Sequence, residues 1–485
     1  MAEGDLKGSV AKTLKWNVID RVSSQILYAV TGIVLANTLS HEDFGLVGAI
    51  LVFQAFAQLF VDSGFASALI QRKEPTHLDY STVLWFNMAM ALGLYVILFF
   101  AAPLIADLFQ GDSRLVPLSR VMFISFIINA AAIVQTNLLM KRMDVKMVAV
   151  SNSAGLIAGA VVGIGLAVAG FGAWAIVWQT ITLATVKTAI LWLTTSWRPL
   201  WMFSWAALRS FFAVGSGVMM TSLLTTVFQN IYSVFIGNRV GLAALGFFSQ
   251  ADKWSKMGVM SISQVLTSSF LPLLSKVQDE PERYARICGK THRFTSYLVF
   301  PAMGLLTVMA APIFHTLFGD KWDPSIPLFQ ILCLRGIFVV LGLLYGNFII
   351  SLGHSRLLVI NEIVRDGAAV VAIALTFGSL GLGVGGLSVF LWGQFAATMV
   401  AWVVTLAMVV RVTGRSFVSY VADTLPYIAL TVMGIVPCVW VGEMTFHPLA
   451  QCVAMAGAFA AVYLGGNLLM GSKVQREVFS YIGKR

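Results

Sequence analysis

Charged residues are scarce in this chain. Only 11% of its 485 residues are charged and 58% are hydrophobic, whereas about 25% are charged in an ordinary soluble domain. The hydrophobic residues lie in runs of about twenty, the length that crosses ~30 Å of hydrocarbon as a helix. Stretches of alternating polarity, which a membrane β-barrel requires, are absent. The composition therefore predicts an all-α integral membrane protein, with the backbone hydrogen bonds closed inside each helix.

Catalytic motifs and cysteine pairs are also missing. The four cysteines have no CxxC spacing, and we interpret them as small buried apolar side chains. No HExxH, GxSxG or P-loop pattern occurs, and the six histidines stand singly near loops. No predicted outer loop is longer than about a dozen residues, which leaves no outer domain for an active site. We expect no enzyme activity, no catalytic residue, no cofactor and no metal site.

The net charge of +10 is spread over helix ends and forms no single basic face, which argues against nucleic acid as a partner. Lys and Arg concentrate in alternate loops, as in the run from Lys276 to Lys290, and the intervening loops carry little beyond Arg114, Arg239 and Lys321. Positively charged loops remain in the cytoplasm. We therefore expect a multi-pass protein of the bacterial inner membrane with both termini in the cytoplasm.

Hydrophobic runs and breaker residues predict about fourteen transmembrane helices. Two sets of six are followed by a terminal pair. The predicted ranges are 14–39, 44–70, 81–109, 114–140, 146–169 and 171–195; then 205–236, 241–273, 291–317, 325–352, 356–379 and 383–410; and finally 418–440 and 448–470.

A weak internal repeat has an offset of 201 residues. Asn37 and Gly45 map onto Asn238 and Gly246, within stretches that resemble each other. Both halves begin at the cytoplasm, so they are expected to be parallel repeats about an axis along the membrane normal. We predict two pseudo-symmetric six-helix lobes around a central cavity, residues 1–200 and 201–412, and a terminal helix pair with a cytoplasmic tail, residues 413–485.

Polar side chains repeat on single faces of the predicted spans. Arg21 and Gln25 share a face of the first span, and Gln54 and Gln58 share a face of the second. A charge at membrane depth costs several kcal/mol by insertion scales (~3) and normally meets a cavity or a partner. We expect a cationic cavity that binds a phosphate-bearing ligand. Its expected binding residues are Arg21, Gln25, Gln54, Gln58, Arg120, Lys253, Lys256 and Arg335.

Alternatives stay open for several of these side chains. Arg21 and Lys187 lie near helix ends, where they either face the cavity or extend to the headgroups. Gln54 and Gln58 either line the cavity or form hydrogen bonds between helices. Lys253, Lys256 and Arg335 are ~15 Å from either end of their spans, where extension to the headgroups is harder than for Arg21 and Lys187. We expect these three to be accessible to water and not paired with acids.

A second group of intramembrane charges is expected to act in gating or ion coupling: Asp62, Glu362, Arg365 and Asp366. Asp62 ends the stripe that contains Gln54 and Gln58. It is either a carboxylate for a proton or sodium ion or the partner of Arg21 in a cytoplasmic gate. The other three are spaced so that they alternatively form a self-neutralising cluster on one helix.

Several stretches resemble the Wzx-type polysaccharide transporter family. The resemblance is specific in the first eighty residues and looser afterwards, and it extends to at least the tenth predicted span. The family belongs to a superfamily that also contains multidrug exporters and peptidoglycan-precursor flippases. The matching stretches are WNVIDR (16–21), LSHEDFGL (39–46), FVDSGF (60–65) and SALIQRK (67–73), then 245–249, 274–279 and 318–322.

This resemblance implies a carrier that opens its cavity alternately to each side. It implies flipping of an undecaprenyl-pyrophosphate-linked oligosaccharide from the cytoplasmic to the periplasmic leaflet, for surface polysaccharide assembly. Its partners would be this lipid-linked substrate, membrane lipids, a coupling proton or sodium ion, and polymerase and chain-length proteins. Two alternatives stay open. A multidrug exporter of the same superfamily would need buried carboxylates for cationic drugs, and a membrane polymerase or glycosyltransferase would need a catalytic outer domain.

Overall fold

The computed structural model describes residues 3–62, 69, 72, 75–444 and 446–482. Throughout these residues the regular secondary structure is helical. The all-α prediction is therefore confirmed, as expected for a chain whose backbone amides must be paired within lipid.

Ten helices in the described part of the chain are long and apolar enough to cross a membrane. The pair α11 (Pro281–Val308) and α12 (Ala310–Leu317), bent by 62°, brings the number to eleven when the pair is counted as one span. The three remaining predicted spans coincide with long helices that fall outside that group, namely α9 (Trp205–Arg239), α10 (Leu242–Ser275) and α14 (Ser355–Thr376). Each predicted range thus falls mainly on a helix or a helix pair; of the range 44–70, residues 63–68 and 70 lie outside the described residues. The count of fourteen spans stays a prediction.

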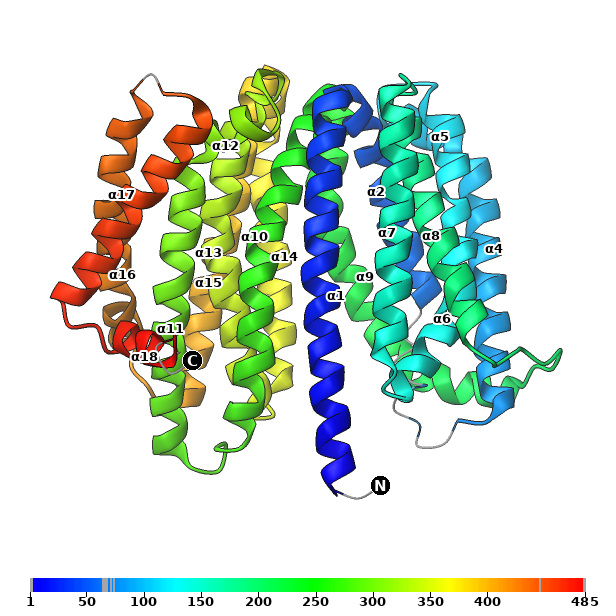
Figure 1. Ribbon diagram of the computed structural model, residues 1–485, viewed down its shortest axis with the longest axis horizontal. Coiled ribbons are helices and arrows are strands. Elements are labelled where there is room, and N and C mark those ends of the chain that lie inside the picture. The colour runs from blue at the N-terminus through cyan, green and yellow to red at the C-terminus, as the bar shows by residue number, and fades with distance from the viewer. Residues whose placement is uncertain (1–2, 63–68, 70–71, 73–74, 445, 483–485) are drawn as a thin grey trace. The chain divides into compact units, whose positions relative to one another are not determined.

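The chain forms two compact units, Met1–Gly246 and Phe247–Arg485. In the first, α9 packs on α2 and α4, so this unit extends beyond residue 200. The predicted division into two lobes and a terminal pair stays a prediction. Besides α9 and the first turn of α10, the unit contains α1 (Glu3–Thr38), α2 (His41–Asp62), α4 (His77–Leu108), α5 (Leu115–Met122), α6 (Ile124–Lys141), α7 (Val145–Val168) and α8 (Trp174–Thr194) (Figure 1).

Glycines set the close packing of α7 against α8. A Cβ atom on Gly155 would lie 2.8 Å from the carbonyl oxygen of Leu183, and one on Gly159 would lie 2.8 Å from that of Gln179. Lipid is as apolar as a leucine side chain, so helices in a membrane associate through close backbone packing. The glycine stripe provides that packing, and α7 also contacts α1 on another side.

The start of α2 is fixed by Asp43. Its carboxylate accepts hydrogen bonds from the backbone and hydroxyl of Ser40, at 3.0 and 2.7 Å, which caps the helix. The same carboxylate accepts a hydrogen bond from the backbone amide of Ala173, at 2.8 Å, just before α8. One acidic side chain therefore joins the beginnings of two helices.

The first turns of α2 and α10 touch through two glycines. A Cβ on Gly45 would lie 1.8 Å from the carbonyl oxygen of Leu242, and a Cβ on Gly246 would lie 1.9 Å from that of His41. The contact is reciprocal, because the offset of 201 residues carries 41 onto 242 and 45 onto 246. Helix bounds follow the same offset: α1, shifted by 201, falls within one residue of both ends of α9.

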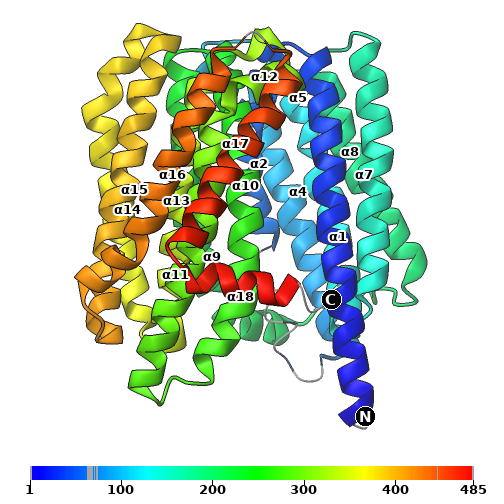
Figure 2. The same cartoon turned by 60° about the vertical axis from the view of Figure 1, so that its left-hand side comes forward.

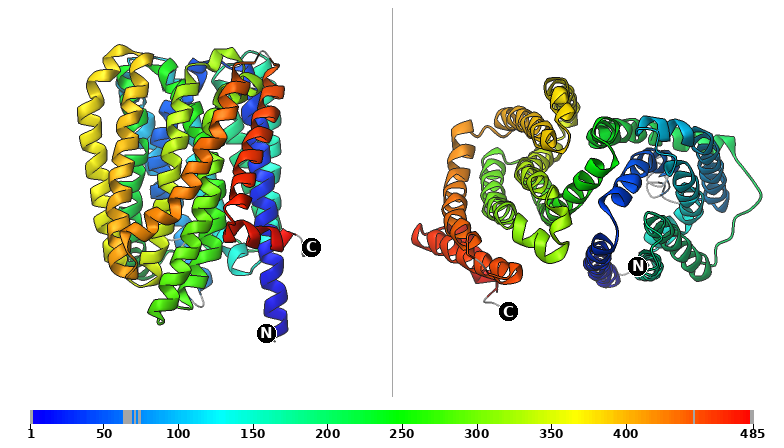
Figure 3. Two further views of the ribbon diagram at one scale, coloured as in Figure 1. Left: turned by 90° about the vertical axis from the view of Figure 1, so that its left-hand side faces the viewer. Right: turned by 90° about the horizontal axis from the view of Figure 1, so that it is seen from above.

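The second unit is built around α11, α13 and α15, which contact one another. Its terminal helices α16 and α17 form a hairpin, drawn in orange and red in both views of Figure 3. Besides α10, α11, α12 and α14, the unit contains η1 (Asp320–Trp322), α13 (Ser325–Ser351), η2 (Phe377–Leu382), α15 (Val384–Thr413), α16 (Phe417–Gly442), α17 (Pro448–Leu469) and α18 (Lys473–Ile482).

A buried polar network ties α11 to its neighbours. The imidazole of His292 lies 2.8 Å from the hydroxyl of Thr424 and 3.2 Å from the carbonyl oxygen of Tyr420, both on α16. On the same helix, the hydroxyl of Tyr284 donates to the carbonyl oxygen of Phe348 on α13, at 2.7 Å. Outside the spans, α18 lies crosswise beside α11 (Figure 2).

Candidate functional site

The first predicted stripe is divided by the packing of α1. Arg21 is exposed and Gln25 is half-buried. The neighbouring Asp20 faces α7, where its carboxylate accepts a hydrogen bond from the side-chain amide of Asn152, at 3.2 Å. The same amide donates to the hydroxyl of Ser24, at 3.1 Å. The sequence argument missed this contact, although Asn152 is a polar residue in an otherwise apolar span.

The second stripe lies on α2. Gln54 and Gln58 are half-buried. The side-chain oxygen of Gln54 is buried and has no hydrogen-bond partner among the described residues. Asp62 is the last residue of α2, and its side chain lies outside the described part. The expected choice between an ion-coupling carboxylate and a pair with Arg21 stays a prediction.

Arg120 contacts Phe99 within the first unit. Its Nε donates to the carbonyl oxygen of Phe99 on α4, at 3.2 Å. The guanidinium also lies 4.3 Å from the centre of the Phe99 ring, within cation–π range. This geometry favours a role in holding α5 against α4, and a role in ligand binding stays a prediction.

The two lysines of α10 differ in their surroundings. Both side chains are exposed. Lys256 forms an ion pair with Asp252 at 2.6 Å, one helical turn away, so it differs from the expected free cation. Lys253 lies 5.5 Å from the centre of the Trp254 ring and has no acidic partner among the described residues. Of this pair, Lys253 is the cation available to an anionic ligand.

Arg335 lies on α13 and is half-buried. Its Nε donates to the hydroxyl of Thr398 on α15, at 3.0 Å. That hydroxyl in turn donates to the backbone carbonyl of Gln394, at 2.9 Å. These contacts join α13 to α15, and a role of Arg335 in binding an anion stays a prediction.

The charges of α14 form the local cluster that the spacing allows, with one arginine between two carboxylates and a net charge of −1. Arg365 donates from Nη1 to Glu362, at 2.9 Å, and from Nε and Nη2 to Asp366, both at 3.1 Å. Both partners are on the same helix, three residues before and one residue after the arginine. The local-cluster alternative is therefore confirmed, and a part for these residues in gating stays a prediction.

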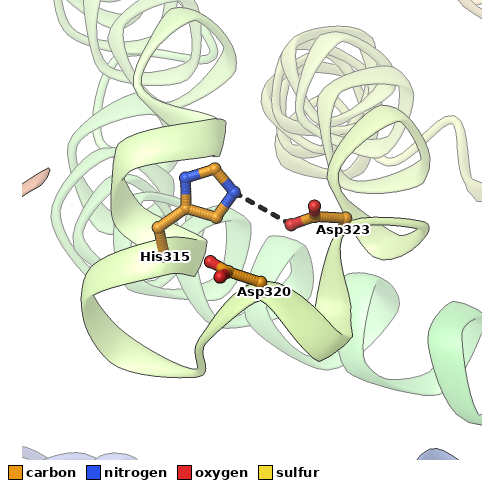
Figure 4. A group of neighbouring side chains, drawn as sticks. All are labelled: His315, Asp320 and Asp323. Atoms are coloured by element: carbon orange, nitrogen blue, oxygen red, sulfur yellow. Dashed lines mark hydrogen bonds and ion pairs between the residues drawn. The ribbon is translucent and has the colours of Figure 1, made fainter. Parts of the chain in front are cut away.

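One group of side chains has the composition of a metal site. His315, Asp320 and Asp323 place their ligand atoms within 4.8 Å of one another around η1 (Figure 4). The hydrogen bond from His315 Nε2 to Asp323, at 2.9 Å, accounts for their proximity. The two carboxylates are exposed, and such groups are common on protein surfaces. We assign no metal to them.

The structure therefore sorts the expected binding residues. Arg21 and Lys253 are exposed and have no acidic partner within the described ranges. Arg120 and Lys256 are engaged locally. The shared cavity of the expected residues stays a prediction.

Comparison with known proteins gives a family. A sequence profile of the family described as "Polysaccharide biosynthesis protein" matches residues 34–327, more than half of the chain. The succinoglycan biosynthesis transport protein ExoT of Rhizobium meliloti is 25% identical over 427 residues, 87% of this chain and 82% of that protein. The teichuronic acid biosynthesis protein TuaB of Bacillus subtilis is 28% identical over 420 residues, 84% and 82%. The lipopolysaccharide biosynthesis protein WzxC of Escherichia coli is 24% identical over 430 residues, 85% and 84%.

Solved structures give the fold. The lipid II flippase MurJ in an inward closed conformation matches with a TM-score of 0.75 and 13% identity, over 93% of this chain and 98% of that chain. An inward-facing multidrug resistance transporter of the MATE family, in the MOP superfamily, matches with a TM-score of 0.60 and 17% identity, over 81% and 96%. The chain therefore shares the all-helical fold of these proteins.

Proposed function

The chain belongs to the polysaccharide biosynthesis protein family, and from this premise we propose that it is a flippase for a lipid-linked oligosaccharide. It would move an undecaprenyl-pyrophosphate-linked repeat unit from the cytoplasmic to the periplasmic leaflet by alternating access. The observation that carries the proposal is the similarity over 87% of the chain to a succinoglycan transport protein. The fold supports it, because a solved structure with the same fold is a lipid II flippase.

The electrostatics suit such a substrate. A pyrophosphate headgroup is anionic, and the exposed Lys253 provides a cation with no competing carboxylate among the described residues. Lys and Arg recognise phosphate by charge and by hydrogen bonding. Outward movement of an anion also follows the membrane potential, which contributes ~2.3 kcal/mol per charge per 100 mV.

The proposal is tested with the purified full-length protein in sealed vesicles that contain a short-chain polyprenyl-pyrophosphate oligosaccharide. A lectin that cannot cross the membrane measures how much glycan becomes accessible on the other side. We expect faster exposure than in protein-free vesicles, and no movement of a cationic dye. Dye transport without glycan movement would favour the multidrug exporter, and elongation of the glycan would favour a polymerase.

We further propose that the protein resides in the bacterial inner membrane with both termini in the cytoplasm. The support is the alternation of Lys and Arg between loops. Reporter fusions after Arg485 and within 276–290 are expected to report cytoplasm, and fusions within 319–323 are expected to report periplasm. A periplasmic signal after Arg485 would contradict this topology.

We also propose a residue for ion coupling or gating, and the candidate is Asp62. If Asp62 takes up a proton or sodium ion, Asp62→Asn is expected to abolish the dependence of flipping on an imposed ion gradient. If it pairs with Arg21 to close the cytoplasmic gate, Asp62→Asn and Arg21→Gln are expected to give the same loss of inward closure. Unchanged flipping and unchanged ion dependence in Asp62→Asn would remove both roles.

A further inference from the structure

A basic pocket lies in the second unit, between the N-terminal part of α11 and the start of α16. Its volume is about 290 Å³, and it is lined by Ala285, Arg286, Arg293 and Arg415. Three of the four lining residues are arginines, whose planar guanidinium groups match the geometry of phosphate oxygens.

Arg415 is held in place from three sides. It forms an ion pair with Asp423, in the second turn of α16. Its guanidinium lies 5.2 Å from the centre of the Tyr420 ring. It also lies against the backbone of Gly289 on α11, where a Cβ atom would be only 1.4 Å from its Nη1. A glycine is therefore required on α11 for the guanidinium to occupy this position.

The pocket keeps an excess of positive charge. Arg293 also forms an ion pair with Asp423, at 3.1 Å, so two guanidinium groups share one carboxylate. Arg286 is exposed and has no acidic partner among the described residues. The three arginines of the lining and the carboxylate of Asp423 give a net charge of +2, and Glu280 and Glu282 lie on the adjoining surface that Arg286 also lines. The adjacent Lys290 adds nothing to it, because it is paired with Glu477 at 2.8 Å.

The surroundings of the pocket are those of a membrane surface. Immediately after Arg415, α16 begins with exposed apolar side chains, and Phe417, Val418 and Val421 are 45%, 73% and 40% exposed. On a transmembrane helix such a face contacts lipid. The guanidinium groups therefore lie where an apolar, lipid-facing surface ends, the level at which lipid phosphates are found.

We propose that this pocket binds the phosphate group of an anionic phospholipid. Basic pockets between transmembrane helices bind anionic headgroups in this way. The three arginines would hold the phosphate oxygens, while the acyl chains lie along the exposed apolar face of α16. The proposal does not depend on which substrate the protein flips, because it concerns a site on one unit and a lipid of the bulk membrane.

The test uses the full-length protein in detergent, with bound lipid counted by native mass spectrometry during titration with phosphatidylglycerol or phosphatidylcholine. We expect phosphatidylglycerol to bind more tightly than phosphatidylcholine. Arg286→Gln is expected to weaken the binding of phosphatidylglycerol about fivefold, which is equivalent to ~1 kcal/mol per basic side chain at a membrane surface. The matched control is Arg283→Gln, which removes the same charge from the same helix. Because Arg283 is paired with Glu280 at 3.0 Å, this control is expected to leave binding unchanged.

Two further measurements keep the proposal open to refutation. Asp423→Asn removes the competing carboxylate and is expected to tighten phosphatidylglycerol binding. Inorganic pyrophosphate separates the sources of phosphate: if it binds in an Arg286-dependent manner and phosphatidylglycerol does not, the lipid assignment is overturned. Equal binding of phosphatidylglycerol by the wild type, Arg286→Gln and Arg283→Gln would overturn the site itself.

Discussion

Replacing Gly45 by alanine tests the contact between α2 and α10 directly. The added Cβ would lie 1.8 Å from the carbonyl oxygen of Leu242, whereas real Cβ contacts essentially never fall below 3.0 Å. The difference, 3.0 minus 1.8, means that the two helices must separate by about 1.2 Å at this point. The obstructing atom belongs to the backbone of a helix, so no change of rotamer relieves the clash.

The energetic cost follows from the geometry. Overpacking a close contact typically costs ~1–3 kcal/mol, which lowers the population of the contacting state by about 5- to 150-fold. Gly246→Ala is expected to behave alike, because its Cβ would lie 1.9 Å from the carbonyl oxygen of His41. If this contact closes in each transport cycle, both variants are expected to slow flipping. Gly165→Ala is the matched control, because nothing lies within 4 Å of a Cβ at that position.

The assay is a distance measurement by pulsed electron paramagnetic resonance between spin labels at Glu42 and Arg239, in a background without the native cysteines. Both positions are exposed. The short-distance fraction is expected to shrink in Gly45→Ala and Gly246→Ala and to stay unchanged in Gly165→Ala, while all three variants elute as folded protein. If Gly45→Ala and Gly246→Ala both keep the label distances and the flipping rate of the wild type, the reasoning is refuted.

Two further predictions concern charge. Lys253→Gln is expected to slow flipping about tenfold, which corresponds to the loss of one hydrogen bond to a charged group (~1.5 kcal/mol). Lys256→Gln is expected to slow flipping as well, and substitution of either lysine by Glu is expected to slow it further. Asp252→Asn frees Lys256 from its ion pair, so its addition to Lys253→Gln is expected to restore part of the lost flipping rate in the vesicle assay. In the loop before α5, a side-chain hydrogen bond from Arg114 lowers the pKa of Asp112. The contribution of this pair to the free energy of unfolding is therefore fully present above the ordinary carboxyl pKa of about 3.9. It is lost as the pH falls through the lower pKa of the folded state. Arg114→Gln is therefore expected to lower the melting temperature at pH 7, and the difference from wild type is expected to narrow at pH 3; a constant difference would contradict the assignment.

Hydropathy predicted the helices well, because lipid permits few alternatives to a helix for an apolar run. It placed the start of the first span at residue 14, whereas α1 begins at Glu3. The apolar run marks where a helix enters lipid, and a helix whose next residues are charged continues into water. The bounds of a span and the bounds of a helix are different quantities, and the sequence pattern reports the first.

Charge pairing could be predicted only where it is local. Asp252 and Lys256 are four residues apart, a spacing that permits the observed pair, although we expected Lys256 to be unpaired. The carbonyl of Phe99 that binds Arg120 lies on another helix, and Gly289 and Arg415 are far apart in the chain. Such contacts follow from how helices pack, which hydropathy does not specify. The candidate site was therefore predictable as a set of polar residues and not as a set of partners.

The reciprocal contact of Gly45 and Gly246 has the symmetry of a two-fold axis. Gly45 meets Leu242, and the residues that correspond to these two by the offset, Gly246 and His41, meet each other in the same way. Such a contact is called isologous, and a two-fold axis makes it between identical subunits. The stretches 41–45 and 242–246, which the offset of 201 residues relates to each other, therefore meet as the two sides of a two-fold contact do, so that a substitution on one side has a counterpart on the other.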